Sequence, residues 1–212
     1  ILTMPETMSI ERRSLLKAFG AEIVLTDGDM AMQGSIHKAR ELNQKIPNSI
    51  ILEQFENPAN PMAHRHHTGL EILEQVAGPI DGFCSGIGTG GTITGIGETL
   101  KALNPKIRIW AVEPENAAIL AGGTVGTHIQ MGIGDGVVPE VLNQEIYDSI
   151  YIVTDDEALQ TAKDLARKEG LMCGISSGTN VAAALKLAHE LGEGKTVVTI
   201  LPDTAERYFS TP

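Results

Sequence analysis

The sequence predicts an α/β protein with a mostly parallel sheet that carries helices on both faces. Two observations support this fold class. Apolar runs of strand length alternate with amphipathic runs of helix length, and a crossover helix between two consecutive strands makes those strands parallel. A glycine-rich loop at residues 85–92 lies between an apolar run at 80–84 and a helix-like run at 93–103. In an open α/β sheet, a loop at this place binds the ligand.

Four elements are expected before residue 56. Ser9 fits the N-cap of the first helix and Gly20 fits its end, because these residue types are favoured at those two positions. The elements, in order, are a helix at 10–19, a strand at 22–26, a helix at 30–44 and a short strand at 49–52.

The middle of the chain contains the strand and the loop that define the fold class. The two prolines of residues 57–61 predict a rigid connector, because each proline fixes its own φ and keeps the preceding residue extended. After it we expect a helix to Val76, a strand at 80–84, the glycine-rich loop, a helix at 93–103, a strand at 107–112 and an irregular segment at 114–139.

The last part of the chain is more regular. Thr154 fits an N-cap, with Glu157 at the capping-box position three residues later, and Gly170 fits the end of that helix. The elements predicted here are a strand at 149–153, the helix from Thr154, a turn at 176–178, a helix at 180–191 and a buried strand at 196–201.

Composition narrows the classes of partner and compartment. The chain has 212 residues, of which 42% are hydrophobic, so it can bury a sizeable core. Its net charge of −11 argues against nucleic acid or an anionic membrane as partner. We expect no membrane span, because no apolar run approaches about 20 residues, and no signal peptide, because the N-terminus lacks that pattern. Cys84 and Cys173 suggest no disulfide framework, which favours the cytoplasm.

The glycine-rich loop has the chemistry of a phosphate site. Four glycines stand in the six positions 86–91, where no helix or strand interior would favour them. A loop that opens a helix presents unpaired N–H groups and the positive end of the helix dipole to an anion. Thr89 and Thr92 add two hydroxyl donors. A compact phosphate is the ligand that this combination predicts.

A dinucleotide is the alternative ligand for the same loop. Gly86, Gly88 and Gly91 match G-x-G-x-x-G, and Glu113 ends the next strand near the distance at which a ribose-binding acid stands. That fingerprint belongs on the first strand–helix turn of a binding domain, whereas about three other elements precede it here. We therefore expect a monophosphate rather than NAD.

Several motifs together resemble one enzyme family. Residues 88–92 (GTGGT) and 174–178 (GISSG) are similar to the pyridoxal-phosphate (PLP) enzymes of the cysteine synthase (O-acetylserine sulfhydrylase) and cystathionine β-synthase family, as are residues 2–13, 54–61 and 206–208. The resemblance covers nearly the whole chain in the family's order. It implies the tryptophan synthase β-like architecture of fold-type II PLP enzymes, with PLP as the cofactor.

The resemblance assigns roles to individual residues. It implies that the cofactor phosphate binds to Gly88, Thr89, Gly90, Gly91 and Thr92. Ser176 resembles the serine that contacts the pyridine nitrogen, although the sequence alone also allows it as a helix N-cap. Gln54 resembles the glutamine at the substrate carboxylate, and Gly132 and Gly134 resemble the loop that faces the reacting amino acid.

No metal site is expected. His64, His66 and His67 stand close together, but one nearby carboxylate and no second cluster do not make a ligand set, and a solvated helix face is the simpler interpretation.

One feature of the family is missing from this sequence. The family's Schiff-base lysine stands in a Ser-x-Lys segment, and none of the nine lysines has that context. We therefore expect the catalytic lysine upstream of Ile1 and no catalytic residue of this kind in the chain, which would be inactive alone. Residues 1–55 would then be the remainder of a smaller N-terminal lobe, and residues 56–212 the larger domain that binds the cofactor phosphate.

For the intact enzyme, the resemblance implies synthesis of L-cysteine from O-acetyl-L-serine and sulfide. A cystathionine β-synthase-like enzyme or a phosphoserine-using sulfhydrylase is the near alternative. An NAD-binding oxidoreductase and a non-catalytic binding fragment are more remote. The family also implies a homodimer and serine acetyltransferase as a partner, whose C-terminal tail enters the active-site cleft.

Overall fold

The computed structural model describes residues 1–211. By its internal packing the chain divides into two compact units. The smaller unit consists of Ile1–Glu53 together with the C-terminal segment from Thr204, and the larger unit is Gln54–Asp203. The assignment of two functional lobes, divided after residue 55, stays a prediction.

The smaller unit is built on two parallel strands, β1 (Leu2–Pro5) and β2 (Ile23–Thr26), joined by α1 (Ile10–Ala18) and followed by α2 (Ala31–Lys45). The predicted cap of α1 is confirmed, because the Ser9 hydroxyl accepts a hydrogen bond from the Arg12 amide at 3.3 Å. Gly20 ends the turn after α1 with a φ of 87°, a conformation that favours glycine.

The strand predicted at 49–52 is wrong. The structure leaves these residues irregular, with Ile50 82% exposed and Leu52 74% exposed. Their apolar side chains favour a strand, but within residues 1–211 no other strand pairs with them. Periodicity alone could not reveal that absence.

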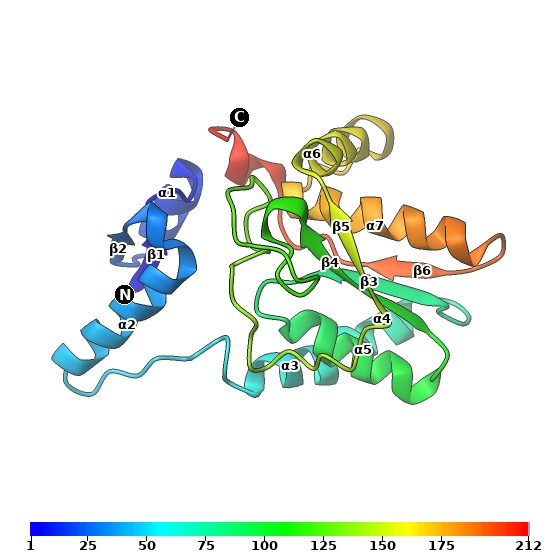
Figure 1. The fold of residues 1–212 in the computed structure, drawn as a ribbon, viewed down its shortest axis with the longest axis horizontal. Helices are drawn as coiled ribbons and strands as arrows, with labels where there is room; N and C mark the ends of the chain where they lie inside the picture. Colours follow the sequence, from blue (N-terminus) through cyan, green and yellow to red (C-terminus); the bar gives the residue numbers. More distant parts are fainter. Residues whose placement is uncertain (212) are drawn as a thin grey trace. The chain divides into compact units, whose positions relative to one another are not determined.

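The larger unit confirms the predicted fold class. Its sheet has four parallel strands in the order β5-β4-β3-β6. Figure 1 shows α6 and α7 on one face of this sheet and α3, α4 and α5 on the other. The bounds are α3 (Ala59–Ala63), α4 (Gly69–Gln75), β3 (Gly82–Gly86), α5 (Gly91–Leu103), β4 (Arg108–Pro114), β5 (Ser149–Val153), α6 (Asp155–Asp164), α7 (Ile175–Leu191) and β6 (Val197–Thr199).

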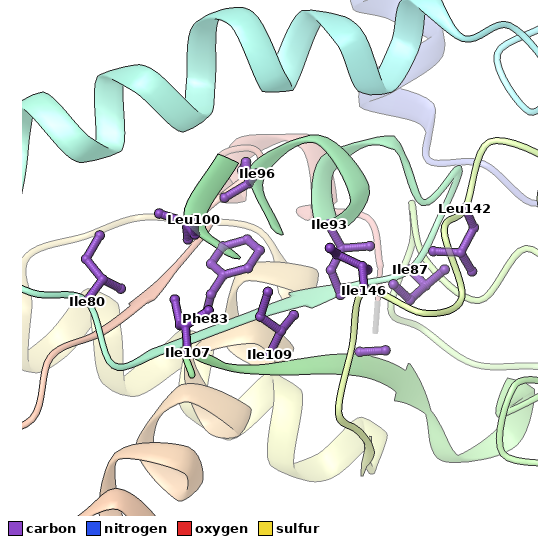
Figure 2. Close-up of a cluster of buried hydrophobic side chains, with 11 residues drawn as sticks. Ile80, Phe83, Ile87, Ile93, Ile96, Leu100, Ile107, Ile109, Leu142 and Ile146 are labelled. Atoms are coloured by element: carbon purple, nitrogen blue, oxygen red, sulfur yellow. The ribbon is translucent and has the colours of Figure 1, made fainter. Parts of the chain in front are cut away.

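The core of this unit lies between α5 and the sheet (Figure 2). The central strands β3 and β4 are buried on both faces, as expected of parallel strands covered by helices. The cluster is formed by Ile80, Phe83, Ile87, Ile93, Ile96, Leu100, Ile107, Ile109, Ala111, Leu142 and Ile146. Burial of these side chains fixes α5, and with it the loop between β3 and α5.

Two helices begin earlier than predicted. Helix α3 starts at Ala59, so the expected connector at 57–61 already contains helix, and Pro61 lies in the first turn, where a missing N–H costs little. Helix α7 starts at Ile175 rather than at residue 180. The predicted turn at 176–178 is therefore the first turn of α7. Gly178 is needed there because a Cβ atom would collide with the Ala158 carbonyl oxygen of α6.

The predicted ends of α6 are confirmed. The Thr154 hydroxyl accepts from the Glu157 amide at 3.1 Å. The helix passes into a π-helical turn, Leu165–Glu169, and ends at Gly170 with a φ of 71°. Within residues 1–211, none of the helices is long and apolar enough to cross a membrane.

Candidate functional site

The glycine-rich loop lies at the carboxyl edge of the four-stranded sheet, where it joins β3 to α5. Gly90 is the N-cap of α5 in the left-handed conformation, with a φ of 77°, and makes no side-chain cap. The Gly91 amide is covered from within the loop, because it donates to Thr89 Oγ1 at 3.3 Å. The remaining amides of the first turn have no intrahelical partner, so the helix end suits an anion.

The glycines of the loop have a packing role that the sequence did not reveal. A Cβ atom at Gly88 would collide with the Gly132 carbonyl oxygen, and one at Gly91 would collide with the Asn60 amide. A Cβ atom at Gly90 would lie 2.8 Å from Leu142 Cβ. The glycine density therefore reflects close contacts within the protein as well as space for a ligand.

The two threonine hydroxyls of the loop contact the helical segment that begins with α3. Asn60 Nδ2 donates to Thr89 Oγ1 at 2.9 Å, and His64 Nε2 lies 3.2 Å from Thr92 Oγ1. His66 and His67 are exposed, as expected of a solvated helix face. For His64 this interpretation is wrong, because its side chain is half-buried and contacts Thr68 and Thr92. Burial also lowers the pKa of its imidazole.

The predicted substrate loop lies beside the phosphate loop. The Gly134 amide donates to the Ile87 carbonyl at 2.8 Å. Gly132 and Gly134 both have positive φ. A Cβ atom added at Gly132 would have no neighbouring atom within 4 Å, so this side of the loop is open. Asp135 follows at once, and burial raises the pKa of its carboxyl, an effect that His128 partly opposes.

Helix α7 brings Ser176 to the same edge of the sheet. Asn180 Oδ1 accepts from the Gly86 amide at 2.7 Å, and Asn180 Nδ2 donates to the Ile200 carbonyl at 2.7 Å. Ser176 stands one turn before Asn180 on the same helix face, beyond the end of β3. The N-cap interpretation of Ser176 is wrong, because Gly174 is the N-cap of α7.

Gln54 is exposed at the start of the larger unit. Its carbonyl oxygen accepts from Asn60 Nδ2 at 2.8 Å, so that one side chain connects Gln54 with the phosphate loop. The predicted site residues on the two loops and on α7 thus lie at the carboxyl edge of the sheet. Gln54 is connected to that edge through Asn60, which contacts Thr89.

Three buried or half-buried side chains of this edge were missed from the sequence: Asn60, Gln130 and Asn180. Each is an amide that connects the site to other elements. Only Asn60 had a signal, since it stands in one of the motifs that carry the resemblance.

The dinucleotide alternative does not fit the structure. Glu113 is 2% exposed, and its two carboxylate oxygens accept from the amides of Leu120 and Ala121 at 2.9 and 3.0 Å. A carboxylate occupied in this way cannot bind a ribose. Its role is to hold the irregular segment after β4.

A cavity of about 440 Å³ opens next to α3 and α5. Its lining includes the carboxylates of Glu56, Glu98 and Glu140, which makes it unsuitable for a phosphate. Across residues 1–211, no group of three or more His, Cys, Asp or Glu side chains is placed to hold a metal ion.

Comparison with known proteins finds one enzyme family. Residues 1–203 match the family model described as pyridoxal-phosphate dependent enzyme. A curated cysteine synthase of Staphylococcus aureus is 53% identical over the whole chain, which covers 68% of that protein.

Solved structures of enzymes with related names are also similar to this chain. An O-acetylserine dependent cystathionine β-synthase from Helicobacter pylori has a TM-score of 0.95 at 40% identity, over 99% of this chain and 68% of that one. A cysteine synthase from Entamoeba histolytica has a TM-score of 0.90 at 42% identity, over 99% of this chain and 62% of that one.

Proposed function

The chain belongs to the pyridoxal-phosphate dependent enzyme family, and on that basis we propose that it carries the cofactor site of a cysteine synthase. The observation that supports this most strongly is the 53% identity to a cysteine synthase along the entire chain. The intact enzyme makes L-cysteine from O-acetyl-L-serine and sulfide.

The residues at the edge of the sheet fit the phosphate of PLP. Apart from the Gly91 amide, which donates to Thr89 Oγ1, the amides of the first turn of α5 have no intrahelical partner, and the N-cap glycine offers them no cap side chain. Thr89 and Thr92 place two hydroxyls beside those amides. Gly88 to Thr92 therefore bind the phosphate, and Ser176 on α7 contacts the pyridine nitrogen.

When bound, PLP supplies an electron sink for the α-carbon of an amino acid. A neutral Ser176 hydroxyl does not hold a proton on the ring nitrogen as a carboxylate would, so the sink stays shallow and favours loss of a β-leaving group. Gln54 binds the substrate carboxylate, and the loop from Gly132 to Gly134 faces the reacting carbon. The bond from Cβ to the acetate oxygen breaks, and a bond from Cβ to sulfur forms.

None of the nine lysines of the chain is the residue that attaches the cofactor in this enzyme. The ion pairs of the described residues support this for five of the lysines that each contact a carboxylate: Lys38, Lys45, Lys101, Lys168 and Lys195. A proton acceptor at the α-carbon contributes about 10²–10⁴-fold to a rate, so the chain alone is inactive.

A test of this claim uses borohydride reduction of the 212-residue chain with PLP, followed by peptide mapping and an assay for cysteine from O-acetyl-L-serine and sulfide. We expect no stoichiometric label and no cysteine above the non-enzymatic rate. One lysine labelled stoichiometrically, with turnover, would contradict the proposal.

A cystathionine β-synthase-like activity is the second candidate, because the structure from Helicobacter pylori named for that activity has a TM-score of 0.95. Its identity of 40% is lower than the 53% of the cysteine synthase, so we favour sulfide as the nucleophile.

The amino-acid donor is a separate question. Titration of the PLP-loaded chain with O-acetyl-L-serine and with O-phospho-L-serine, followed by absorbance, distinguishes the two donors. A stronger response to O-phospho-L-serine would favour the phosphoserine-using alternative.

We also propose that the intact enzyme is a cytoplasmic homodimer and that the C-terminal tail of serine acetyltransferase is a partner. The family resemblance supports these three points. A pull-down with a peptide of that tail, and the mass of the protein in solution, test the two assemblies separately.

A further inference from the structure

Two side chains of one helical segment hold the two hydroxyls of the phosphate loop. Asn60 lies in α3, and His64 follows it four residues later, so that both side chains share one face of the segment. Asn60 Nδ2 lies 2.9 Å from Thr89 Oγ1, and His64 Nε2 lies 3.2 Å from Thr92 Oγ1.

These contacts depend on two glycines of α5. A Cβ atom at Gly91 would collide with the Asn60 amide, and one at Gly95 would collide with the Pro61 carbonyl oxygen and lie 2.8 Å from His64 Cβ. Gly91 and Gly95 stand one turn apart on α5. They let the backbone of α5 come close enough for Asn60 and His64 to reach the threonines.

The hydrogen bonds of Asn60 define the direction in which the Thr89 hydroxyl points. Asn60 Nδ2 also lies 2.8 Å from the Gln54 carbonyl oxygen, which can only accept, so this atom is the amide donor. Thr89 Oγ1 therefore accepts from Asn60 and from the Gly91 amide. With both lone pairs used, the Thr89 O–H is left to donate, and a phosphate oxygen is a partner that only accepts.

His64 controls the second hydroxyl in the same way. Burial lowers the pKa of this imidazole, which is therefore neutral at pH 7 and carries one ring proton. Its Nδ1 lies 3.0 Å from Thr68 Oγ1. Either ring nitrogen can carry this proton, and we assign it to Nε2, so that His64 donates to Thr92 and accepts from Thr68. The Thr92 O–H is then free to donate to an anion.

We propose that Asn60 and His64 are positioning residues that orient the Thr89 and Thr92 hydroxyls as donors toward the phosphate monoester of the cofactor. The proposal rests on the proposed function, which places that phosphate on this loop. Neither residue touches the phosphate itself, and each acts through one threonine.

The measured quantity is the dissociation constant of pyridoxal divided by that of PLP, each obtained by equilibrium dialysis of the full chain. This ratio isolates the contribution of the phosphate, because a general loosening of the site weakens both ligands. Thermal unfolding of each variant shows whether it is folded at the temperature of the dialysis.

Asn60→Asp keeps the shape of the side chain but removes its donor. We expect the ratio to fall about 10- to 100-fold, the effect of losing one hydrogen bond to a charged group. Asn104→Asp is the matched control at the other end of α5, where Asn104 donates to the Ile80 carbonyl at 3.1 Å. In a Thr89→Val background, Asn60→Asp should have little further effect, whereas simple charge repulsion would reduce the ratio in both backgrounds.

For His64 the pair of variants is His64→Gln, which can still donate to Thr92, and His64→Glu, which can only accept. We expect His64→Gln to retain the ratio within about threefold and His64→Glu to lose about tenfold or more. His67→Glu adds the same charge on the exposed face and should leave the ratio unchanged. Should Asn60→Asp fail to fold, the two His64 variants decide the proposal by themselves.

The outcomes separate this proposal from the proposed function. A ratio near one in the unchanged protein would show that the phosphate contributes nothing, which would overturn the proposed cofactor site and this inference together. A large ratio that Asn60→Asp and His64→Glu leave unchanged would overturn this inference alone. A loss in Asn60→Asp that persists in the Thr89→Val background would also overturn it, because Asn60 would not be acting through Thr89.

Discussion

Gln130 connects three elements at the edge of the site and is fully buried. Its amide nitrogen donates to the Val153 carbonyl at 3.1 Å and to Asp155 Oδ1 at 2.9 Å, and its oxygen accepts from Thr179 at 2.8 Å. It therefore holds the segment before Gly132 against the end of β5, the start of α6 and the first turns of α7.

Gln130→Ala should reduce the free energy of unfolding by about 2–4 kcal/mol, because it leaves buried polar partners unsatisfied and opens a cavity. Gln160→Ala is the matched control, since Gln160 is exposed and bonds only to Asp164 among the described residues. Urea unfolding followed by circular dichroism measures both. Equal losses in the two variants would contradict the role given to Gln130.

Asp135 makes a pH-dependent contribution to stability. Burial raises the pKa of its carboxyl above the ordinary value of 3.8, so the folded protein binds a proton more readily than the unfolded chain. The contribution of this group to stability is then present below the unfolded pKa and is lost as pH rises through the folded pKa. Asp135→Asn should raise stability at pH 7 and lose this advantage as the pH approaches 3.8. A constant difference across that range would contradict the account.

At the residue scale, the sequence predicts contacts between residues that are close together in the chain. Ser9 and Thr154 were identified as N-caps because a cap is a contact over three residues. The roles of Asn60 and Gln130 could not be predicted, because their partners are far away in the sequence. Asn60 contacts Thr89, 29 residues later, and Gln130 contacts Val153 and Thr179, 23 and 49 residues later. The burial of His64 was missed for the same reason.

At the scale of elements, one side chain of α7 connects this helix to β3 and to the segment after β6. Asn180 is 2% exposed and bonds to Gly86 of β3 and to Ile200 after β6. Asn180→Ala should therefore cost about 2–4 kcal/mol and loosen the position of Ser176. The check is unfolding in urea, with hydrogen exchange of the first turns of α7. Unchanged exchange there would contradict the connection to Ser176.

The start of α6 depends on a single cap. Thr154→Ala should cost about 1 kcal/mol, because the Glu157 amide loses its partner, and Thr154→Ser should cost only a few tenths, because the hydroxyl remains. Thermal unfolding measures both. Equal losses in the two variants would mean that the methyl group of Thr154, and not its hydroxyl, stabilises the helix.

The elements were predicted well where they are long and bounded by local signals. All four strands of the larger unit and α5 and α6 follow from apolar runs and caps. The sequence predicts the start of α7 five residues late, because Gly178 fits a turn as well as a helix start. It is a packing contact with α6, and that contact exists only once both helices are in place.

At the scale of the whole molecule, a chain with a net charge of −11 is proposed to bind an anionic cofactor through a local arrangement of amides and hydroxyls. The charge of the molecule and the charge of the site are independent, because donors at a helix end act over a short range. Fold class and cofactor could be predicted from the sequence since both follow from contiguous motifs. The contacts that orient Thr89 and Thr92 could not, because α3 and α5 are brought together only by folding.

The chain should associate in solution. Several large apolar side chains are exposed, among them Phe19 at 79%, Ile50 at 82% and Phe209 at 71%. Exposed apolar surface of this kind favours contact with a second copy. Light scattering after gel filtration should give at least twice the mass of one chain. The mass of a single chain at micromolar concentration would contradict this prediction.

The central claim is that Gly88 to Thr92 bind the phosphate of PLP at the start of α5. A crystal structure of the full chain grown with PLP tests it most directly. The account predicts phosphate density at the first turn of α5, within hydrogen-bond distance of the Thr89 and Thr92 hydroxyls. Phosphate density at another place, or PLP attached to one of the nine lysines away from this loop, would contradict it.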